Sequence, residues 1–458
     1  MHKCMLLLTV FLGTALLAPD LCHAQTLAPT PPMGWNSWDA YGLTIDEAQF
    51  KANAEVLASL RQYGWQYAVI DEGWYMANPS GHTVPEKKYL WNKDGLLMPA
   101  PDRFPSAAEG AGFKPLADWV HAHGLKFGIH ILRGIPRQVV EKNLPVAGTA
   151  FHAVDAADTA SPCGWDQGNW GVKDNAAGQA YYDSMFKLYA KWGVDFVKVD
   201  CIADHPYRPT EIRQIAEAIR KSGRRMVLSL SPGPTSLSHA QEVMKYAQMW
   251  RISNDHWDIW QPGYRPPQLD EFPFGLKEEF DRLAEWAPYA GPGHWPDADM
   301  LPWGWLGPNP GFGKPRQSRE TREEQRTEFT LWAIARSPLI LGANLTRLDD
   351  FTRSLVTDRE VLDINQQSVT SGPVQMPSGK ATPWRAWYAR TGGRHPKVYL
   401  AVFNLQDSAE TWDLPWTAFH LDERPHSVYD VWNARELPAA KALHVELPAH
   451  GCGLFRAQ

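Results

Sequence analysis

Short apolar runs alternate with helix-like segments between residues 33 and 344. Each run has the length and the apolar character of a buried β-strand. The eight runs are Met33–Trp38, Tyr67–Ile70, Leu125–Ile131, Val194–Asp200, Arg225–Ser231, Met249–Asn254, Gly293–Asp297 and Pro338–Asn344. Eight strand–helix units in succession predict an α/β fold of the (β/α)8 TIM-barrel type. A doubly wound open sheet is the alternative, but no G-x-G-x-x-G turn follows an early strand.

Four segments between these runs carry the start and stop signals of helices. Thr44 and Glu47 form a T-x-x-E capping box, which predicts a helix running toward Leu60. Residues 113–124 and 210–223 each end in a glycine, as many helices do. The segment 323–338 ends in a proline, so its helix is expected to stop at the residue before Pro338.

The pattern changes near Gly372. Beyond it, apolar and polar residues alternate in short stretches, which are separated by turns such as Thr391-Gly392-Gly393. No helical segment interrupts them, so we expect a small antiparallel β-sandwich. The sequence therefore predicts a barrel domain over residues 25–372 and a β-sandwich domain over residues 373–458.

The first 24 residues have the pattern of a secretory signal peptide. Lys3 supplies a positive charge, and Met5–Leu17 is an apolar stretch too short to span a bilayer. Cys22-His23-Ala24 offers small residues at the cleavage positions, so we expect the mature chain to start at Gln25. Export to the periplasm or to the medium follows, and no later segment predicts a membrane helix.

The amino-acid composition indicates which kinds of ligand and which cysteine chemistry the protein can have. A net charge of -6 is mild for 458 residues and disfavours nucleic acid, which requires a basic face. The 22 tryptophans suit a hydrophobic core or stacking against sugar rings. Cys163, Cys201 and Cys452 would remain after signal cleavage, which is too few for a disulfide framework. A Cys163–Cys201 disulfide and three separate thiols both remain possible. The sequence does not specify an oligomeric state.

Acidic residues close at least four of the predicted strands. Lys198 and Asp200 share one face of the fourth strand, and Arg251 and Asp255 share one face at the end of the sixth. The other acidic groups are Asp71 and Glu72 after the second strand and Asp297 and Asp299 on the seventh. Since the carboxyl ends of barrel strands meet at one rim, these groups would line a cup. Isolated salt bridges are the alternative, but a site for a hydroxyl-rich ligand such as a sugar explains the pattern better.

Two carboxylates facing across such a cup support glycoside hydrolysis. A gap of about 5–5.5 Å leads to retention, whereas about 6.5–9.5 Å leaves room for a water molecule and leads to inversion. Lys198 favours the ionised, nucleophilic form of Asp200. Asp255 would need a raised pKa to act as the acid, and Arg251 opposes that rise. No H-E-x-x-H, calcium-loop or zinc-ligand spacing occurs, so neither a metal nor another cofactor is expected.

Six segments resemble glycoside hydrolase family 27, the α-galactosidase (melibiase) family. They are PPMGWNSWDAYG, IDEGW, WGVDFVKVD, WRISND, GPGHWPDADML and LWAIARSPLILGANL, and they occur in this order between Pro31 and Gln366. The resemblance implies a retaining double displacement, with Asp200 as nucleophile and Asp255 as acid/base. It further implies that no cofactor takes part and that Cys163 lies near the sugar. The sugar-binding residues that it implies are Trp38, Asp71, Lys198, Arg251 and Asp299.

Three positions depart from the pattern of this family. Asp71-Glu72 replaces a usual Asp-Asp pair, and His130 stands where the third strand often ends in tyrosine. Leu230-Ser231-Pro232 replaces Cys-Glu-Trp, which changes the residues expected to read the sugar's O2. Ser231 is therefore expected in the substrate site.

Glu72 bears on the choice of sugar. It is one methylene longer than aspartate and would project into the space of galactose's hydroxymethyl group, which L-arabinopyranose lacks. We expect an exo-acting α-galactosidase acting on galactose-containing glycans. A β-L-arabinopyranosidase or another α-glycan hydrolase of the same family is the first alternative. A non-catalytic glycan-binding protein and a metal-dependent hydrolase are alternatives of other classes.

Overall fold

The computed structural model describes residues 26–77, 79, 88–262, 272–374 and 383–457. The predicted signal peptide and the cleavage site before Gln25 lie outside these residues. Among the described residues, no helix combines the length and the apolar character needed to cross a bilayer.

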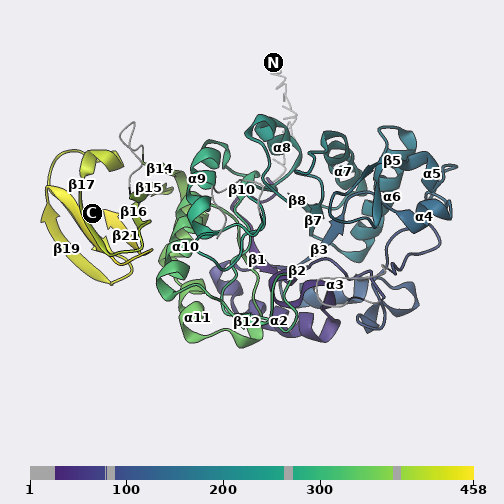
Figure 1. Cartoon of the computed structure of the whole chain (residues 1–458), viewed down its shortest axis with the longest axis horizontal. Helices are drawn as coiled ribbons and strands as arrows, with labels where there is room; N and C mark the ends of the chain where they lie inside the picture. The colour runs from purple at the N-terminus through teal and green to yellow at the C-terminus, as the bar shows by residue number, and fades with distance from the viewer. Residues whose placement is uncertain (1–25, 78, 80–87, 263–271, 375–382, 458) are drawn as a thin grey trace, which may run out of the picture.

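An eight-stranded parallel sheet forms the centre of the first domain (Figure 1). Its strands are β1 (Met33–Asn36), β2 (Tyr67–Ile70), β3 (Lys126–Leu132), β7 (Phe196–Asp200), β8 (Val227–Leu230), β9 (Met249–Arg251), β10 (Trp295–Asp297) and β13 (Leu339–Leu341). They lie in the order β10-β9-β8-β7-β3-β2-β1-β13. Leu301, just after β10, pairs in parallel with Leu341 of β13, so the two ends of the sheet meet as in a (β/α)8 barrel. Seven predicted runs contain one of these strands, the eighth, Leu125–Ile131, ends one residue before β3 does, and the barrel prediction is confirmed.

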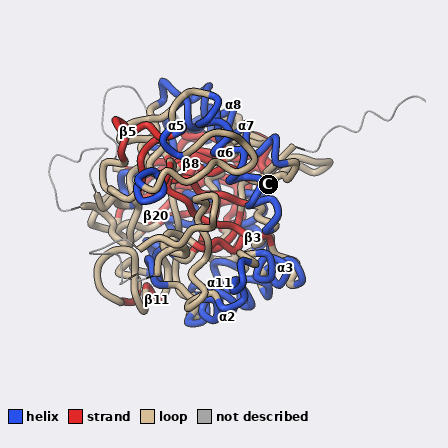
Figure 2. Tube along the Cα trace, turned by 90° about the vertical axis from the view of Figure 1, so that its right-hand side faces the viewer, coloured by secondary structure: helices blue, strands red, loops and turns tan. Residues whose placement is uncertain are grey.

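Helices pack around this sheet, and Figure 2 shows the strands inside a shell of helices and loops. The longer helices are α2 (Glu47–Ser59), α3 (Lys114–Ala122), α6 (Ala176–Trp192), α7 (Pro209–Ser222), α9 (Leu276–Trp286), α10 (Arg322–Ala335) and α12 (Arg359–Gln367). Gly223 caps α7 in the left-handed conformation, as predicted.

Two of the predicted helix ends are wrong. The N-cap of α2 is Asp46, which forms a capping box with Gln49, whereas Thr44 lies in a preceding short 3₁₀ helix. The sequence D-x-x-Q competes with T-x-x-E here, and the later cap prevails. Helix α10 ends at Ala335 because Arg336 adopts a left-handed conformation with φ of 61°, before Pro338 is reached.

The second domain is an antiparallel β-sandwich. One sheet has the order β14-β15-β16-β21-β18-β19, and a two-stranded sheet pairs β17 with β20. The strands are β14 (Ser368–Pro373), β15 (Trp384–Thr391), β16 (Val398–Asn404), β17 (Glu410–Pro415), β18 (His426–Asp430), β19 (Arg435–Ala440), β20 (Ala442–Leu447) and β21 (Cys452–Ala457). Leu400 and Phe455 of the larger sheet share a buried core with Leu414 and Leu443 of the smaller one.

The sandwich begins earlier than residue 373. Ser368 is at once the C-cap of α12 and the first residue of β14, so no linker separates the two elements. The sandwich packs beside α9 and α10 of the barrel, where Phe280 of α9 contacts the rings of Trp387 and Phe403 (Figure 1). The residues that line the cavity described below all belong to the barrel strands and to the segments that follow them.

Candidate active site

A cavity of about 230 Å³ lies at the carboxyl ends of the barrel strands. It brings together most of the residues that the sequence indicated. The predicted residues that line it are Trp38, Asp71, Glu72, Lys198, Asp200, Arg251, Asp255 and Asp299. They come from strands β1, β2, β7, β9 and β10 and the turns that follow them, as the shared rim of a barrel requires.

Asp200 is the last residue of β7, and two donors hold its carboxylate. The backbone N–H of Cys201 donates to Oδ1 over 2.6 Å, and His130 Nε2 donates to Oδ2 over 3.3 Å. Burial would raise the pKa of Asp200, but the hydrogen bond from His130 and the charges of His130 and Lys198 outweigh it and lower this pKa. Asp200 is therefore ionised at neutral pH, as a nucleophile must be.

Lys198 and Asp71 form a buried ion pair beside Asp200. Lys198 Nζ lies 3.0 Å from Asp71 Oδ2, which also accepts a 2.7 Å hydrogen bond from Asn36 Nδ2. Burial opposes ionisation of Asp71, yet Lys198 and His130 lower its pKa to about 2. Both members of the pair stay charged, so they offer a cationic donor and an anionic acceptor to hydroxyl groups.

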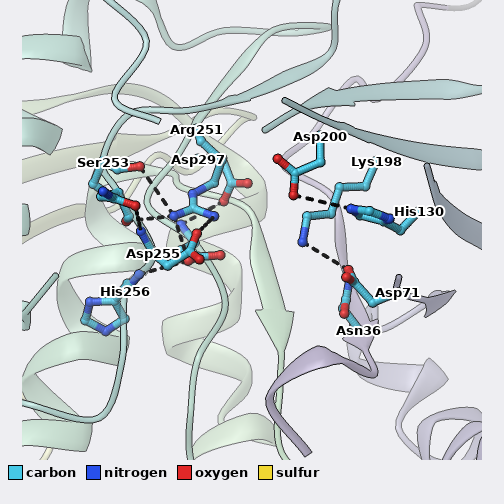
Figure 3. Close-up of polar contacts among 12 residues, drawn as sticks. Asn36, Asp71, His130, Lys198, Asp200, Arg251, Ser253, Asp255, His256 and Asp297 are labelled. Atoms are coloured by element: carbon cyan, nitrogen blue, oxygen red, sulfur yellow. Dashed lines mark hydrogen bonds and ion pairs between the residues drawn. The ribbon is translucent and has the colours of Figure 1, made fainter. Parts of the chain in front are cut away.

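Asp255 lies on the other side of the cavity, in a cluster around Arg251 (Figure 3). Arg251 Nη1 is 3.2 Å from Asp255 Oδ1, and Arg251 Nη2 is 2.7 Å from Asp299 Oδ2. Burial raises the pKa of Asp255, and the negative charges of Asp299 and Asp200 raise it further, against the effect of Arg251. The balance left open by the sequence thus comes out as a raised pKa for Asp255, the direction that a general acid requires.

The two sides of the cavity are electrostatically different. Figure 3 shows Asp200, Lys198 and His130 on one side, and Asp255 and Arg251 on the other. A carboxylate with a lowered pKa thus shares a cavity with a carboxyl group whose pKa is raised. Such a split is the usual mark of a nucleophile and an acid/base in glycoside hydrolysis.

Three residues that the sequence placed at this site do not line this cavity, namely Cys163, Ser231 and Asp297, and Asp297 lines a smaller adjoining one instead. Cys163 is buried and bonded to Cys201, so its sulfur is used in the bridge. This confirms the disulfide hypothesis over three separate thiols, while Cys452 is a buried free cysteine. Ser231 is also buried and lines a much smaller adjoining cavity, whose wall includes Lys198 and Arg251.

Several residues that line the cavity had no predicted role. They are Asp39, Leu43, Trp165, Asp166, His256, Trp257 and Met300. Asp39 and Trp257 follow strand-end residues that the sequence did single out, so closeness in the chain was the available signal. Trp165 and Asp166 come from the excursion between β3 and β7, which the disulfide from Cys163 to Cys201 brings back to the site.

One group within the described part of the chain has the donor atoms of a metal site. It consists of His256, Glu320 and Glu328, whose ligand atoms lie within 4.8 Å of one another. Glu328 is already bonded, however, since His256 Nε2 lies 2.9 Å from Oε1 and Trp303 Nε1 donates to Oε2 over 2.5 Å. Burial and the adjacent Glu328 raise the pKa of Glu320 well above its usual value. The two glutamates therefore fit a pair that shares a proton better than a pair of metal ligands.

Comparison with known proteins matches both domains. Residues 164–367 match a family model described as Alpha galactosidase A, and residues 382–457 match the Alpha galactosidase C-terminal beta sandwich domain. The chain is 28% identical over 471 residues to α-galactosidase A of Cellvibrio japonicus, with 98% of each chain covered.

Solved structures agree with this match. A crystal structure of a family 27 β-L-arabinopyranosidase from Geobacillus stearothermophilus has a TM-score of 0.87 at 41% identity, covering 94% of this chain and 97% of that one. The structure of α-galactosidase I from Mortierella vinacea has a TM-score of 0.71 at 25% identity, covering 94% and 98%. The similarity thus extends over the barrel and the β-sandwich together.

Proposed function

The chain belongs to glycoside hydrolase family 27 and is a glycoside hydrolase, and we propose that it removes terminal α-D-galactosyl residues with retention of configuration. One observation carries this proposal. Asp200, whose pKa is lowered, and Asp255, whose pKa is raised, line the same cavity, in which charged pairs suit a hydroxyl-rich ring. A protein that only bound glycans would not require this split in pKa.

The reaction takes two steps. Asp200 attacks C1 of the terminal sugar, the bond from C1 to the glycosidic oxygen breaks, and Asp255 gives its proton to that oxygen. A water molecule then gives a proton to Asp255 and attacks C1, which releases Asp200. Arg251 stabilises the carboxylate that Asp255 becomes between the two steps.

The ion pairs around the cavity support recognition of a single terminal ring. Lys198 with Asp71 on one side and Arg251 with Asp299 on the other place donors and acceptors where ring hydroxyls would lie. A cavity of about 230 Å³ suits one pyranose ring, which supports exo action.

β-L-Arabinopyranosides are a second candidate substrate. They share the ring configuration of α-D-galactosides and differ by the absent hydroxymethyl group. Glu72 lines the cavity next to Asp71, and its additional methylene narrows the space available to that group. The 41% identical Geobacillus structure, which is titled a β-L-arabinopyranosidase, also favours this activity.

The catalytic assignment is tested with Asp200→Ala. We expect this variant to lose hydrolysis of an aryl α-D-galactopyranoside and of the aryl β-L-arabinopyranoside while still binding sugar. Asp413→Ala in the sandwich, whose side chain is exposed, is the matched control. NMR of the first product formed by the wild-type enzyme should show the anomer of the substrate. Ordinary turnover by Asp200→Ala, or an inverted first product, would refute the mechanism.

The choice of sugar is tested with Glu72→Asp. A pocket difference of one methylene is worth about 1–3 kcal/mol, or roughly 10- to 200-fold in relative kcat/KM. We expect the ratio of galactoside to arabinopyranoside hydrolysis to rise by an amount in this range. An unchanged ratio would show that Glu72 does not read the substituent at C5.

We also propose that the protein is exported. The charged and apolar pattern of residues 1–24 supports this. N-terminal sequencing of the protein from its natural host should begin at Gln25, and recovery of the intact leader from the cytoplasm would contradict it.

A further inference from the structure

Trp165 is a partly exposed indole in the wall of the cavity. Its exposed fraction is 49%, and it lines the cavity together with Glu72 and Asp166. Trp257, another indole of this cavity, is only 1% exposed. A large aromatic side chain that stays open to solvent beside a binding cavity is typical of a ligand contact.

The exposure of the side chains defines the mouth of the cavity. Asp71 and Arg251 expose 2% and 3% of their side chains, so the charged pairs lie at the closed end. Trp165 is far more exposed and therefore lies toward solvent. A terminal sugar bound among the charged pairs would leave its glycosidic oxygen, and the group attached to it, directed toward the open end.

The loop that carries Trp165 is fixed in place. It lies between β5 (Ala157–Pro162) and β6 (Asn169–Val172), and Cys163 ties it to Cys201, the residue after Asp200. The ring of Trp165 meets the ring of His205 edge-on, with centroids 6.0 Å apart. The indole is therefore held beside the nucleophile before any ligand binds, which reduces the entropy lost on binding.

We propose that Trp165 is the platform of a leaving-group subsite that binds the second pyranose ring of a glycan. This inference rests on the proposed hydrolase function and adds a binding site to it. The C–H groups on one face of a pyranose form an apolar surface that packs against an indole. The carboxylate of Asp166, the next residue, lines the same cavity, where it suits a hydroxyl group at the edge of that ring.

The test compares two substrates that differ only in the leaving group. They are a disaccharide with a terminal α-D-galactosyl residue and methyl α-D-galactopyranoside, or the matching β-L-arabinopyranosides if the wild-type enzyme prefers them. We expect Trp165→Ala to lower kcat/KM about tenfold for the disaccharide, the effect of losing one aromatic contact, and to leave the methyl glycoside nearly unchanged. Trp165→Phe should lose less. Phe151→Ala, which removes an exposed aromatic ring that does not line the cavity, is the control.

Inhibition by free galactose separates the two subsites. Its inhibition constant should be the same in wild type and Trp165→Ala, since galactose alone fills only the inner subsite. If Trp165→Ala lowers kcat/KM equally for both substrates, or weakens inhibition by galactose, Trp165 lies against the terminal sugar and the proposal is overturned. No loss on the disaccharide would overturn it as well.

A binding measurement keeps this test independent of turnover. Calorimetry with Asp200→Ala should show that adding Trp165→Ala weakens the binding of the disaccharide and leaves the binding of free galactose unchanged. If wild type hydrolyses neither substrate but this binding difference is seen, the proposed hydrolysis fails and the subsite stands. If hydrolysis is seen but Trp165→Ala changes the binding of the disaccharide and of galactose equally, the subsite proposal fails and the hydrolase function stands.

Discussion

His130 shows how a single residue sets the charge of the nucleophile. Its ring is buried, and Nε2 donates to Asp200 Oδ2. Burial lowers the pKa of His130, but the charge of Asp71 and the hydrogen bond to Asp200 outweigh it and raise this pKa. Lys198 opposes the protonation of His130 from the neighbouring strand. The two carboxylates thus raise the pKa of His130 and favour the protonated form of its ring.

Replacing His130 should shift the pH dependence of the reaction. His130→Phe removes the donor and the charge, so the pKa of Asp200 rises and the acid limb of kcat/KM moves to higher pH. The loss of a charged hydrogen bond should also lower kcat about 10- to 100-fold. His130→Tyr keeps a donor and should lose less. Full pH–rate profiles of the three proteins measure this, and an acid limb that does not move in His130→Phe would show that His130 does not act on Asp200.

The residue scale also shows what a sequence reveals about a site. The alternation of side chains along a strand placed Lys198 and Asp200 on one face, and both line the cavity. Ser231 was expected at the sugar because it stands where the family carries the residues that read O2, but it lies in an adjoining cavity. Cys163 was expected near the sugar, but it is bonded to Cys201 and does not line the cavity, whereas Trp165, two residues later, does.

At the scale of elements, a buried arginine links the loops around the nucleophile. Arg133 follows β3 and donates to the carbonyl groups of Cys201 and Pro162, which flank the disulfide. Its Nη1 also lies 2.7 Å from Oε1 of Glu211 in α7, and both side chains are almost fully buried. The polar groups of three separate segments are thus satisfied by one side chain, as buried polar groups require.

Removing Arg133 should cost far more than removing an exposed arginine. Arg133→Met leaves Glu211 buried without its partner, so we expect the free energy of unfolding to fall by about 3–5 kcal/mol. The matched control is Arg213→Met, which breaks the solvent-exposed pair with Asp174 and should cost less than about 1 kcal/mol. Urea denaturation of both variants measures the difference. Adding Glu211→Gln to Arg133→Met should recover part of the loss, and equal losses for the two single variants would contradict the role of Arg133.

The elements themselves were largely predictable because their signals are local. Apolar runs between turns identified all eight barrel strands. The excursion between β3 and β7 was not predicted as a unit, since its strand β5 is partly exposed and has no apolar run in its sequence. It is shaped instead by long-range contacts, namely the disulfide to Cys201 and the hydrogen bonds to Arg133.

At the scale of the whole molecule, one face of the sandwich is part of the hydrophobic core of the barrel, while the space between the two sandwich sheets holds a second buried core. Trp387, Tyr399 and Phe403 of the sandwich belong to the same buried cluster as the barrel helices. Helix α10 is buried on almost every face because the barrel lies on one side of it and the sandwich on the other. The sequence predicted two domains, but it did not predict that one face of the sandwich joins the core of the barrel, because the apolar pattern of α10 alone does not reveal which partners cover it.

This shared core predicts that the two domains unfold together. Trp387→Ala would open a cavity against Phe280 and should lower the free energy of unfolding by about 3–5 kcal/mol. Calorimetry should still show one transition, at a lower temperature, since each domain buries part of its apolar surface against the other. Trp165→Ala removes an exposed indole and serves as the control, with little change in the transition. A chain that ends before Ser368 should be recovered only as aggregate, because it would expose the apolar face of α10. Two separate transitions in Trp387→Ala, or a soluble and active barrel without the sandwich, would show instead that the barrel is stable alone.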